Sequence, residues 1–249
     1  MHILGVEISE ISRSEALKKV EFFFESDSLH RVYTPNPEML VDASKDAYFR
    51  DVLNAADLTL CDGMGLKLLL GRKVERVAGV DFMSDMCELA ARTGKTVYLL
   101  GSGDRVVLRK AAVALQTKFP NLQIVGMHPG PEIQAEKQGD RVALKIDKDE
   151  NNELIGEIVM AAPDILFVGF GHGKQEKWID EYAESLPSVR VAMGVGGAFD
   201  YISGSVPRAP RVMRSLGLEW LFRLLMQPKR FTRIFKAVII FPLCYLKKQ

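Results

Sequence analysis

The segment that most clearly indicates the architecture reads Thr96-Val97-Tyr98-Leu99-Leu100-Gly101-Ser102-Gly103-Asp104. Its apolar, β-branched beginning is typical of a buried strand, and the glycines lead into a helical pattern over residues 105–118. Backbone amides at such a turn can hold a phosphate, so Gly101 is a candidate anion-binding residue. A dinucleotide-binding fingerprint would have a further glycine at position 106, where Val106 stands. The segment therefore predicts a strand–turn–helix unit and gives weak support to NAD binding.

The same alternation continues along the rest of the chain. Other apolar or β-branched runs lie between helical patterns, at residues 3–8, 31–34, 58–61, 123–125, 165–168 and 189–193. Ser12 opens a capping box for one helix, and Asn36-Pro37 supplies a cap and a first-turn proline for a helix over residues 38–56. Continuous apolar strands between helices predict an α/β, Rossmann-like fold, with a mainly parallel sheet and helices on both faces. Ligands of such sheets bind beyond the carboxyl ends of the strands.

Charge is unevenly distributed along the chain. The 249 residues carry 33 Lys and Arg against 32 Asp and Glu, a net charge of +1. Residues 205–249 hold ten basic side chains and one acid, Glu219, so this part has a charge of +9 and residues 1–204 have −8. We therefore expect a Rossmann-like domain over residues 1–204 and a basic C-terminal appendage over residues 205–249.

The appendage has the pattern of two amphipathic helices broken at Pro228. A basic helix with a large apolar face can lie in the interface of an anionic membrane. The same face could instead pack on the body, or on a second copy of the chain in a homo-oligomer, and the pattern leaves these alternatives open. The appendage is too apolar for a surface that merely binds nucleic-acid phosphates, so no nucleic acid is expected as a partner.

The sequence predicts a cytoplasmic protein without a metal site. Residues 1–7 contain neither a basic leader nor a long apolar stretch, and the longest uncharged apolar run near the end has ten residues, whereas about twenty are needed to span a bilayer. The three cysteines show no C-x-x-C spacing, which argues against a disulfide framework and a zinc site. The only Asp-x-Asp, residues 147–149, is interpreted as part of a solvated loop or helix face.

Polar residues and glycines follow the strands predicted at residues 31–34 and 58–61. Asp62 comes directly after the run 58–61 and is followed by Gly63 and Gly65, which allow the backbone to turn sharply and approach a ligand. A carboxylate at this edge of a sheet can act as a general base. The alternative is that Asp62 merely caps the next helix, and Asn36 after the run 31–34 has the same alternative.

The last two predicted strands also end in glycine-rich segments. After the first of them Gln175 can bind an anion or a sugar hydroxyl, whereas His172 is interpreted as a hydrogen-bonding loop residue and not as a catalytic one. After the second, Gly196 and Gly197 favour close packing against a flat ligand, and Asp200 could accept hydrogen bonds from a ribose or a base. These segments together suggest a phosphorylated or nucleotide ligand.

Several strings resemble those of the bacterial WecG/TagA/CpsF glycosyltransferases, glycosyltransferase family 26. They match in order from about residue 4 to residue 235. They are Thr34-Pro35-Asn36, Ala56-Asp57-Leu58 through Asp62-Gly63-Met64-Gly65, Glu75-Arg76-Val77-Ala78-Gly79-Val80-Asp81, Lys174-Gln175-Glu176-Lys177-Trp178, Gly194-Val195-Gly196-Gly197-Ala198-Phe199-Asp200, Arg208-Ala209-Pro210 and Gly217-Leu218-Glu219-Trp220-Leu221.

The resemblance implies an inverting, metal-independent enzyme of cell-surface polysaccharide or teichoic acid biosynthesis that needs no cofactor. Such an enzyme moves a sugar, N-acetylmannosamine or a related hexose or uronic acid, from a UDP donor to an undecaprenyl-diphosphate-linked sugar. It works as a peripheral protein on the cytoplasmic face of the membrane. By motif position Asp62 would be the general base. The other residues implied for substrate binding are Thr34, Asn36, Arg76, Gln175, Asp200, Arg223, Arg230 and Arg233.

Two other functions are weighed against the transferase. One is an NAD-dependent oxidoreductase, which the missing glycine at position 106 disfavours. The other is a non-catalytic membrane adaptor whose appendage recruits partners. Retention of function after replacement of Asp62 would favour the adaptor.

Overall fold

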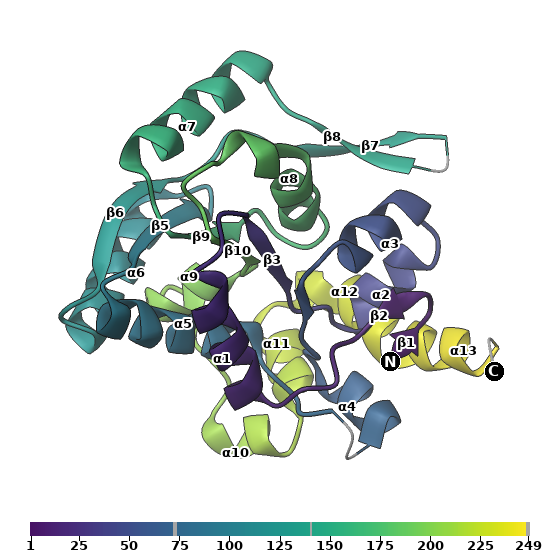
Figure 1. The fold of residues 1–249 in the computed structure, drawn as a ribbon. Coiled ribbons are helices and arrows are strands. Elements are labelled where there is room, and N and C mark those ends of the chain that lie inside the picture. The colour runs from purple at the N-terminus through teal and green to yellow at the C-terminus, as the bar shows by residue number, and fades with distance from the viewer. Residues whose placement is uncertain (72–73, 140, 248–249) are drawn as a thin grey trace.

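The structure, a computed structural model, describes residues 1–71, 74–139 and 141–247. Lys248, one of the ten basic residues of the appendage, lies outside them. The central strands are β3 (His30–Tyr33), β4 (Leu58–Thr59), β5 (Thr96–Gly101), β6 (Gln123–His128), β9 (Ile165–Gly169) and β10 (Val191–Gly194). They form one six-stranded sheet in the order β4-β3-β10-β9-β5-β6, with every neighbouring pair parallel (Figure 1). The predicted α/β fold is confirmed.

Helices cover both faces of this sheet. Successive residues of a strand point to opposite sides, so a continuous apolar strand places apolar side chains on both faces. In β9, Leu166 and Val168 belong to one apolar core, and Ile165 and Phe167 belong to the other. The first core is covered by α2 (Pro37–Ala43), α3 (Ala47–Asn54), α4 (Met64–Leu70), α7 (Lys148–Ala161) and α8 (Lys174–Tyr182), the last followed by a 3-10 turn at Ala183–Ser185. The second core is covered by α1 (Arg13–Phe23), α5 (Gly79–Thr93), α6 (Arg105–Lys118) and α9 (Ala198–Ile202).

The helix that follows β10 and the helices that follow its neighbours β3 and β9 lie on different faces of the sheet. The helices that follow β3 and β9 pack on the first core, whereas the helix that follows β10 packs on the second. Loops that part in this way open a crevice at the carboxyl ends of the strands, which is where ligands bind in open α/β sheets.

Two elements of the body were predicted wrongly, and one hairpin was not predicted. Residues 3–8 form a separate hairpin, β1 (His2–Ile3) with β2 (Val6–Glu7), because Leu4 and Gly5 turn the chain with positive φ angles of 51° and 90°. The single helix predicted for residues 38–56 is split into α2 and α3, where the Asp46 side chain accepts a hydrogen bond from the Phe49 amide and starts a new helix. The hairpin β7 (Gln134–Gln138) with β8 (Arg141–Lys145) was not predicted, because β7 is exposed throughout and has no apolar run.

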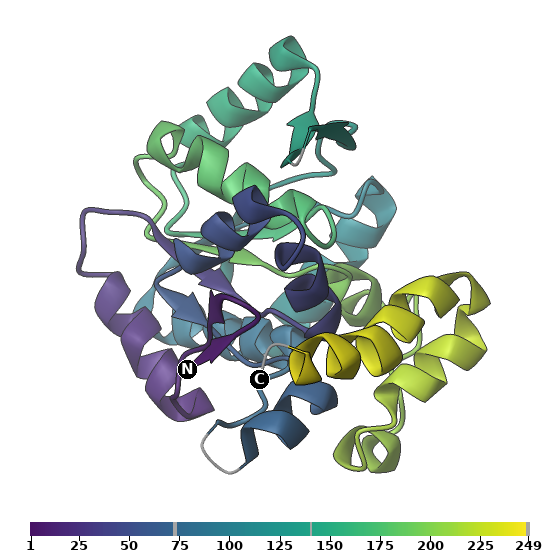
Figure 2. The ribbon, with the colours of Figure 1, turned by 90° about the vertical axis from the view of Figure 1, so that its right-hand side faces the viewer.

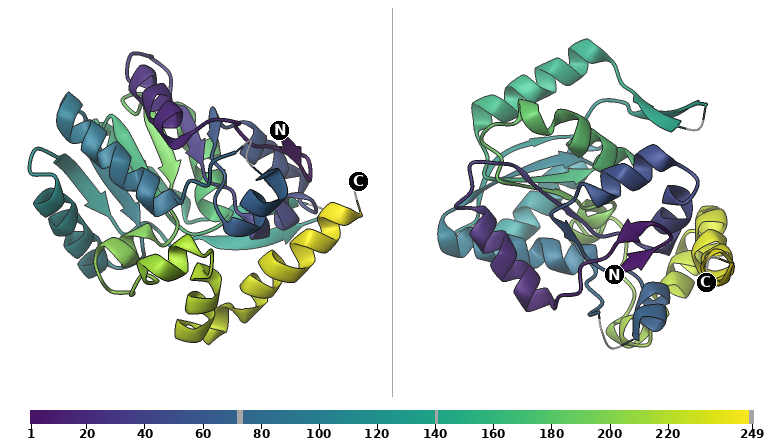
Figure 3. Two further views of the ribbon diagram at one scale, coloured as in Figure 1. Left: turned by 90° about the horizontal axis from the view of Figure 1, so that it is seen from below. Right: turned by 45° about the vertical axis from the view of Figure 1, so that its right-hand side comes forward.

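The appendage consists of short helices that wrap around one end of the sheet. They are α10 (Arg211–Ser215), α11 (Glu219–Met226), a 3-10 turn (Pro228–Arg230), α12 (Phe231–Phe235), a π-helical turn (Lys236–Ile240) and α13 (Phe241–Leu246). The predicted break at Pro228 is present, and the segment after it runs as one yellow rod (Figure 3, left). The single helix predicted before Pro228 is wrong, because Gly217 turns the chain with a φ of 73° and separates α10 from α11.

One side of this rod packs on the body. It lies along α2 (Figure 2), and Phe241 is fully buried in the first core. The other side remains exposed, with apolar residues such as Phe231 and Leu243 more than half accessible. None of the helices in the described part of the chain combines the length and the apolar character that a bilayer span requires.

Candidate active site

A cavity of about 460 Å³ lies at the carboxyl ends of the strands, a volume in the range of small-molecule sites. Each neighbouring strand contributes residues from the loop that follows it. These are Thr34 and Asn36 after β3, Asp62 after β4, Ser102 and Gly103 after β5, Gly169 to His172 with Lys174 to Glu176 after β9, and Gly194 to Ala198 with Asp200 and Tyr201 after β10. The appendage closes the cavity with Glu219, Arg223, Arg230 and Arg233.

Backbone contacts hold Asp62 at the cavity wall. Its amide donates to the carbonyl oxygen of Pro35 at 3.1 Å, and Gly63 then turns the chain with a φ of 100°. A side chain at Gly63 would come within 3.0 Å of Pro37, so this glycine allows close packing on the neighbouring loop. Asp62 does not cap α4, whose N-cap position is Gly63. Its Oδ2 instead accepts a hydrogen bond of 3.4 Å from the amide of Gly79, the first residue of α5.

The surroundings of Asp62 make its carboxylate more basic than usual. Burial raises the pKa of the Asp62 carboxyl, and the nearby Glu219 carboxylate acts in the same direction. The guanidinium groups of Arg223 and Arg76 oppose this increase, as does the hydrogen bond from Gly79. A carboxylate with a raised pKa in an accessible cavity has the properties of a general base.

The appendage brings three arginines to the cavity. Arg223 donates to Glu219 at 2.8 Å and lies 5.2 Å from the ring centre of Tyr201. Arg230 faces Asp200, and burial raises the pKa of that carboxyl even though the Arg230 charge opposes the rise. Cationic side chains at a cavity of this size provide a site for a diphosphate.

Gln175 fixes the loop that follows β10. Its side chain is buried, its Nε2 donates to Glu176 Oε1 at 2.7 Å, and its Oε1 accepts from the amide of Gly196 at 2.9 Å. A side chain at Gly194 would lie 2.7 Å from the Gln175 Nε2. Gln175 therefore shapes the glycine loop that lines the cavity.

Comparison with known proteins shows the family of the chain. A model of the glycosyl transferase WecG/TagA/CpsF family matches residues 1–249. The chain belongs to this family. The family assignment confirms the resemblance found in the sequence, and it favours a transferase over an NAD-dependent oxidoreductase.

Relatives of this WecG/TagA/CpsF protein include enzymes of Staphylococcus aureus. The proteins from strains MW2 and NCTC 8325 / PS 47 are each 29% identical over 245 residues, which cover 96% of this chain and 89% of theirs. Both are named N-acetylglucosaminyldiphosphoundecaprenol N-acetyl-beta-D-mannosaminyltransferase.

The cavity of this family member collects most of the residues that the sequence singled out. The residues that line it are Thr34, Asn36, Asp62, Gln175, Gly196, Gly197, Asp200, Arg223, Arg230 and Arg233. They come from distant parts of the chain, and parallel strands align their carboxyl ends at one edge of the sheet.

Arg76 and Gly101 are not among the residues that line this cavity. Gly101 packs on the backbone of Gly169, where a side chain would come within 2.6 Å of the carbonyl carbon, so Ser102 and Gly103 face the cavity instead. Arg76 lines a second cavity, and its Nη2 donates to Glu219 at 3.4 Å.

Glu219 is the main residue of the site that was not predicted. It lines the cavity and pairs with both Arg76 and Arg223, at 3.4 and 2.8 Å. Its signal in the sequence is that it is the only acid among ten bases of the appendage. Tyr201, next to Asp200, carried no comparable signal.

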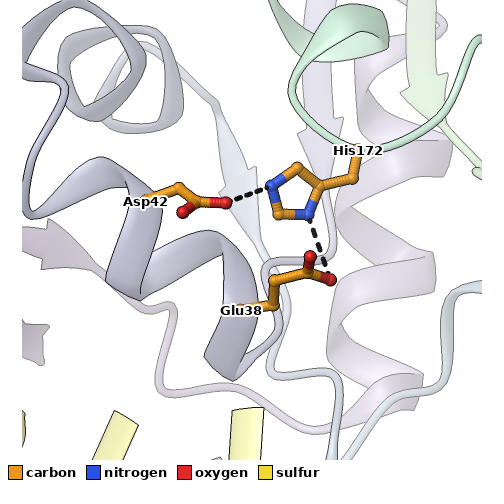
Figure 4. Close-up of side chains that lie close together, drawn as sticks. All are labelled: Glu38, Asp42 and His172. Atoms are coloured by element: carbon orange, nitrogen blue, oxygen red, sulfur yellow. Dashed lines mark hydrogen bonds and ion pairs between the residues drawn. The ribbon is translucent and has the colours of Figure 1, made fainter. Parts of the chain in front are cut away.

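A cluster of Glu38, Asp42 and His172 lies at the rim of the cavity (Figure 4). It is the one group among the described residues whose atoms could together hold a metal ion. His172 Nε2 lies 2.9 Å from Asp42 Oδ2, in agreement with its interpretation as a hydrogen-bonding residue. The appendage already neutralises both carboxylates, because Arg233 Nε donates to Glu38 at 3.0 Å and Lys236 Nζ donates to Asp42 at 2.7 Å. The cluster therefore joins the appendage to the body.

Proposed function

We propose that this glycosyltransferase moves a sugar from a UDP donor to an undecaprenyl-diphosphate-linked sugar, with inversion at the transferred carbon and without a metal ion or cofactor. The staphylococcal relatives are named as N-acetylmannosaminyltransferases of N-acetylglucosaminyldiphosphoundecaprenol. N-acetylmannosamine is therefore the first donor sugar to test, followed by related hexoses and uronic acids. The observation that carries the proposal is the carboxylate of Asp62 in a cavity that three arginines also line.

Asp62 acts as the general base. It takes the proton of the acceptor hydroxyl while the hydroxyl oxygen forms a bond to the anomeric carbon of the donor. The bond from that carbon to the diphosphate breaks on the opposite face, and UDP leaves with the electron pair. Attack and departure on opposite faces invert the configuration, as in the inverting reactions of glycoside hydrolysis.

The three arginines of the appendage stabilise the departing diphosphate. Arg223, Arg230 and Arg233 are held at the cavity before the reaction, so they need no reorganisation when charge develops on UDP. Preorganised donors of this kind typically lower a barrier by about 3 to 4 kcal/mol each. In this mechanism they supply the charge stabilisation that a metal ion supplies in other nucleotide-sugar enzymes.

The exposed side of the appendage brings the enzyme to its lipid-linked substrate. Its accessible apolar residues lie beside basic ones, a combination that suits the interface of an anionic membrane. The most exposed are Val212, Leu216, Leu225, Met226, Phe231, Leu243 and Leu246. We place the enzyme on the cytoplasmic face of the membrane, as a peripheral protein.

The decisive experiment incubates the protein with lipid-linked N-acetylglucosamine and a panel of UDP-sugars and identifies the product by mass. Asp62→Asn keeps the shape of the side chain but cannot accept the proton, so we expect unchanged UDP binding and a loss of about 10² to 10⁴ in turnover. Asp180→Asn is the matched control, because the pKa of Asp180 is also raised by burial but the residue lies outside the cavity. Turnover of Asp62→Asn at the wild-type rate would overturn the mechanism and favour a non-catalytic adaptor.

A further inference from the structure

A second cavity, of about 430 Å³, lies beside the first. It is an open hollow lined by the start of α1, by α4, by residues 76–81 and by Arg208 with α10. Nine of the described residues line it, of which five are basic and one, Asp81, is acidic. The basic residues are Arg13, Lys67, Arg76, Arg208 and Arg214. This concentration of positive charge distinguishes the cavity from an ordinary surface depression.

Three of the five cations are already paired with carboxylates. Arg208 forms two hydrogen bonds with Asp81, at 2.6 and 2.8 Å, and Arg13 pairs with Asp85. Arg76 pairs with Glu219, as described above.

The other two cations have no carboxylate partner in the part of the chain that the structure describes. Lys67 Nζ donates only to the carbonyl oxygen of Val74, at 2.6 Å. The Arg214 side chain makes no hydrogen bond or ion pair with the described residues, and its Nε is buried. Arg214 helps to lower the pKa of Asp81, but that carboxylate is already hydrogen-bonded to Arg208. Two cations without an ion pair of their own attract a multiply charged anion, and a diphosphate is an anion that arginine and lysine bind well.

This cavity adjoins the first one. Ala78 lines both, and the Arg76–Glu219 pair stands between them, with Arg76 on the wall of the second and Glu219 on the wall of the first. Asp62 senses both of these charges, because each affects the pKa of its carboxyl. Asp62 also accepts a hydrogen bond from Gly79, the neighbour of Ala78, so its carboxylate lies near the boundary of the two cavities.

Two exposed apolar residues are the sequence neighbours of residues that line the basic cavity. Leu68 follows Lys67 on α4 and is 76% exposed, and Leu216 follows the lining residue Ser215 and is 64% exposed. The two segments touch, since a side chain at Gly217 would come within 2.5 Å of Met64. Exposed apolar residues beside a cationic cavity fit an anion that carries a hydrocarbon chain.

We propose that the second cavity binds the diphosphate of the lipid-linked acceptor, with Lys67 and Arg214 as its main contacts and the hydrocarbon chain leaving past Leu68 and Leu216. This inference rests on the proposed transferase function, which it extends by giving donor and acceptor separate anion sites. The acceptor sugar then lies between the two cavities, with its hydroxyl near Asp62.

Kinetics of Lys67→Gln and Arg214→Gln test the assignment. Loss of one charge-assisted contact should raise KM for the lipid-linked acceptor by about tenfold, while KM for the UDP-sugar stays unchanged. Lys110→Gln is the control, because this exposed lysine on α6 lies outside both cavities and its loss removes the same charge. A wild-type acceptor KM in both cavity variants, or an equal rise in Lys110→Gln, would refute the assignment.

Direct binding without a donor identifies the source of the phosphate. We expect farnesyl diphosphate to bind the wild-type protein more tightly than inorganic diphosphate does, and to bind both variants weakly. Binding to phosphatidylglycerol vesicles should be the same for all proteins. A loss of vesicle binding with an unchanged acceptor KM would assign the cavity to a phospholipid headgroup and overturn the proposal, and equal affinity for both diphosphates would refute the lipid part. Absence of any transfer product from the wild-type protein would instead count against the transferase function, whatever the binding results.

Discussion

The substitution Phe241→Ala tests whether the appendage must be docked for activity. Phe241 is fully buried in the core beneath α2, whereas the ion pairs that also join the appendage to α2, Arg233–Glu38 and Lys236–Asp42, are partly exposed to solvent. Truncation of a buried phenylalanine costs about 3 to 5 kcal/mol, and partly exposed ion pairs contribute about 0.2 to 1 kcal/mol each. Phe241 therefore dominates the docking free energy.

A loss of this size raises the undocked population of residues 231–246 by about two to four orders of magnitude. Hydrogen exchange followed by mass spectrometry should show lost protection in this segment, while the sheet strands keep theirs. Turnover should fall in parallel, because Arg230 and Arg233 line the cavity only when the appendage is docked.

Leu243→Ala is the matched control on the same helix. Leu243 is 53% exposed, so its truncation should leave both hydrogen exchange and turnover in solution near wild type. Unchanged protection and turnover in Phe241→Ala would refute the conclusion that docking of the appendage completes the cavity.

Two further predictions follow from the charge and the exposure of the appendage. Glu219→Gln removes a carboxylate that helps to raise the pKa of Asp62, so Asp62 should stay deprotonated to lower pH. The acidic limb of the kcat–pH profile should therefore shift to lower pH. A shift to higher pH would contradict this electrostatic role. Leu225→Gln and Phe231→Gln remove exposed apolar side chains, each of which contributes about 1.5 to 3 kcal/mol when buried, so sedimentation with phosphatidylglycerol vesicles should weaken while the melting temperature stays the same. Vesicle binding equal to wild type in both variants would show that this face does not contact the membrane.

Sequence reasoning was most successful where local chemistry alone determines structure. The capping box at Ser12 and the cap at Asn36 are both present, because each needs only residues within one helical turn. It failed at residues 3–8, where a left-handed turn inside an apolar run made a hairpin. It also missed β7, whose exposed residues show no apolar period.

The residues of the candidate site also divide into those that the sequence could locate and those that depend on distant parts of the chain. Asp62, Asp200 and the glycine loops could be located because the residue after a buried strand falls at a known edge of a parallel sheet. Glu219 could not be assigned, because its role depends on two arginines from distant parts of the chain, Arg76 and Arg223. The position of Arg76 could not be derived for the same reason, since the motif that contains it does not show which of the two cavities the guanidinium lines.

The alternation of apolar runs, caps and glycines, taken alone, determines an α/β sheet with ligand-binding loops at one edge, because these patterns act over a few residues. The charge count determines a basic, amphipathic end. Only the tertiary structure decides that this end packs on α2 through Phe241, supplies arginines to the first cavity and encloses a second one with Lys67 and Arg214. Those contacts join residues more than a hundred positions apart, and their geometry follows from the packing of the whole chain rather than from any local pattern.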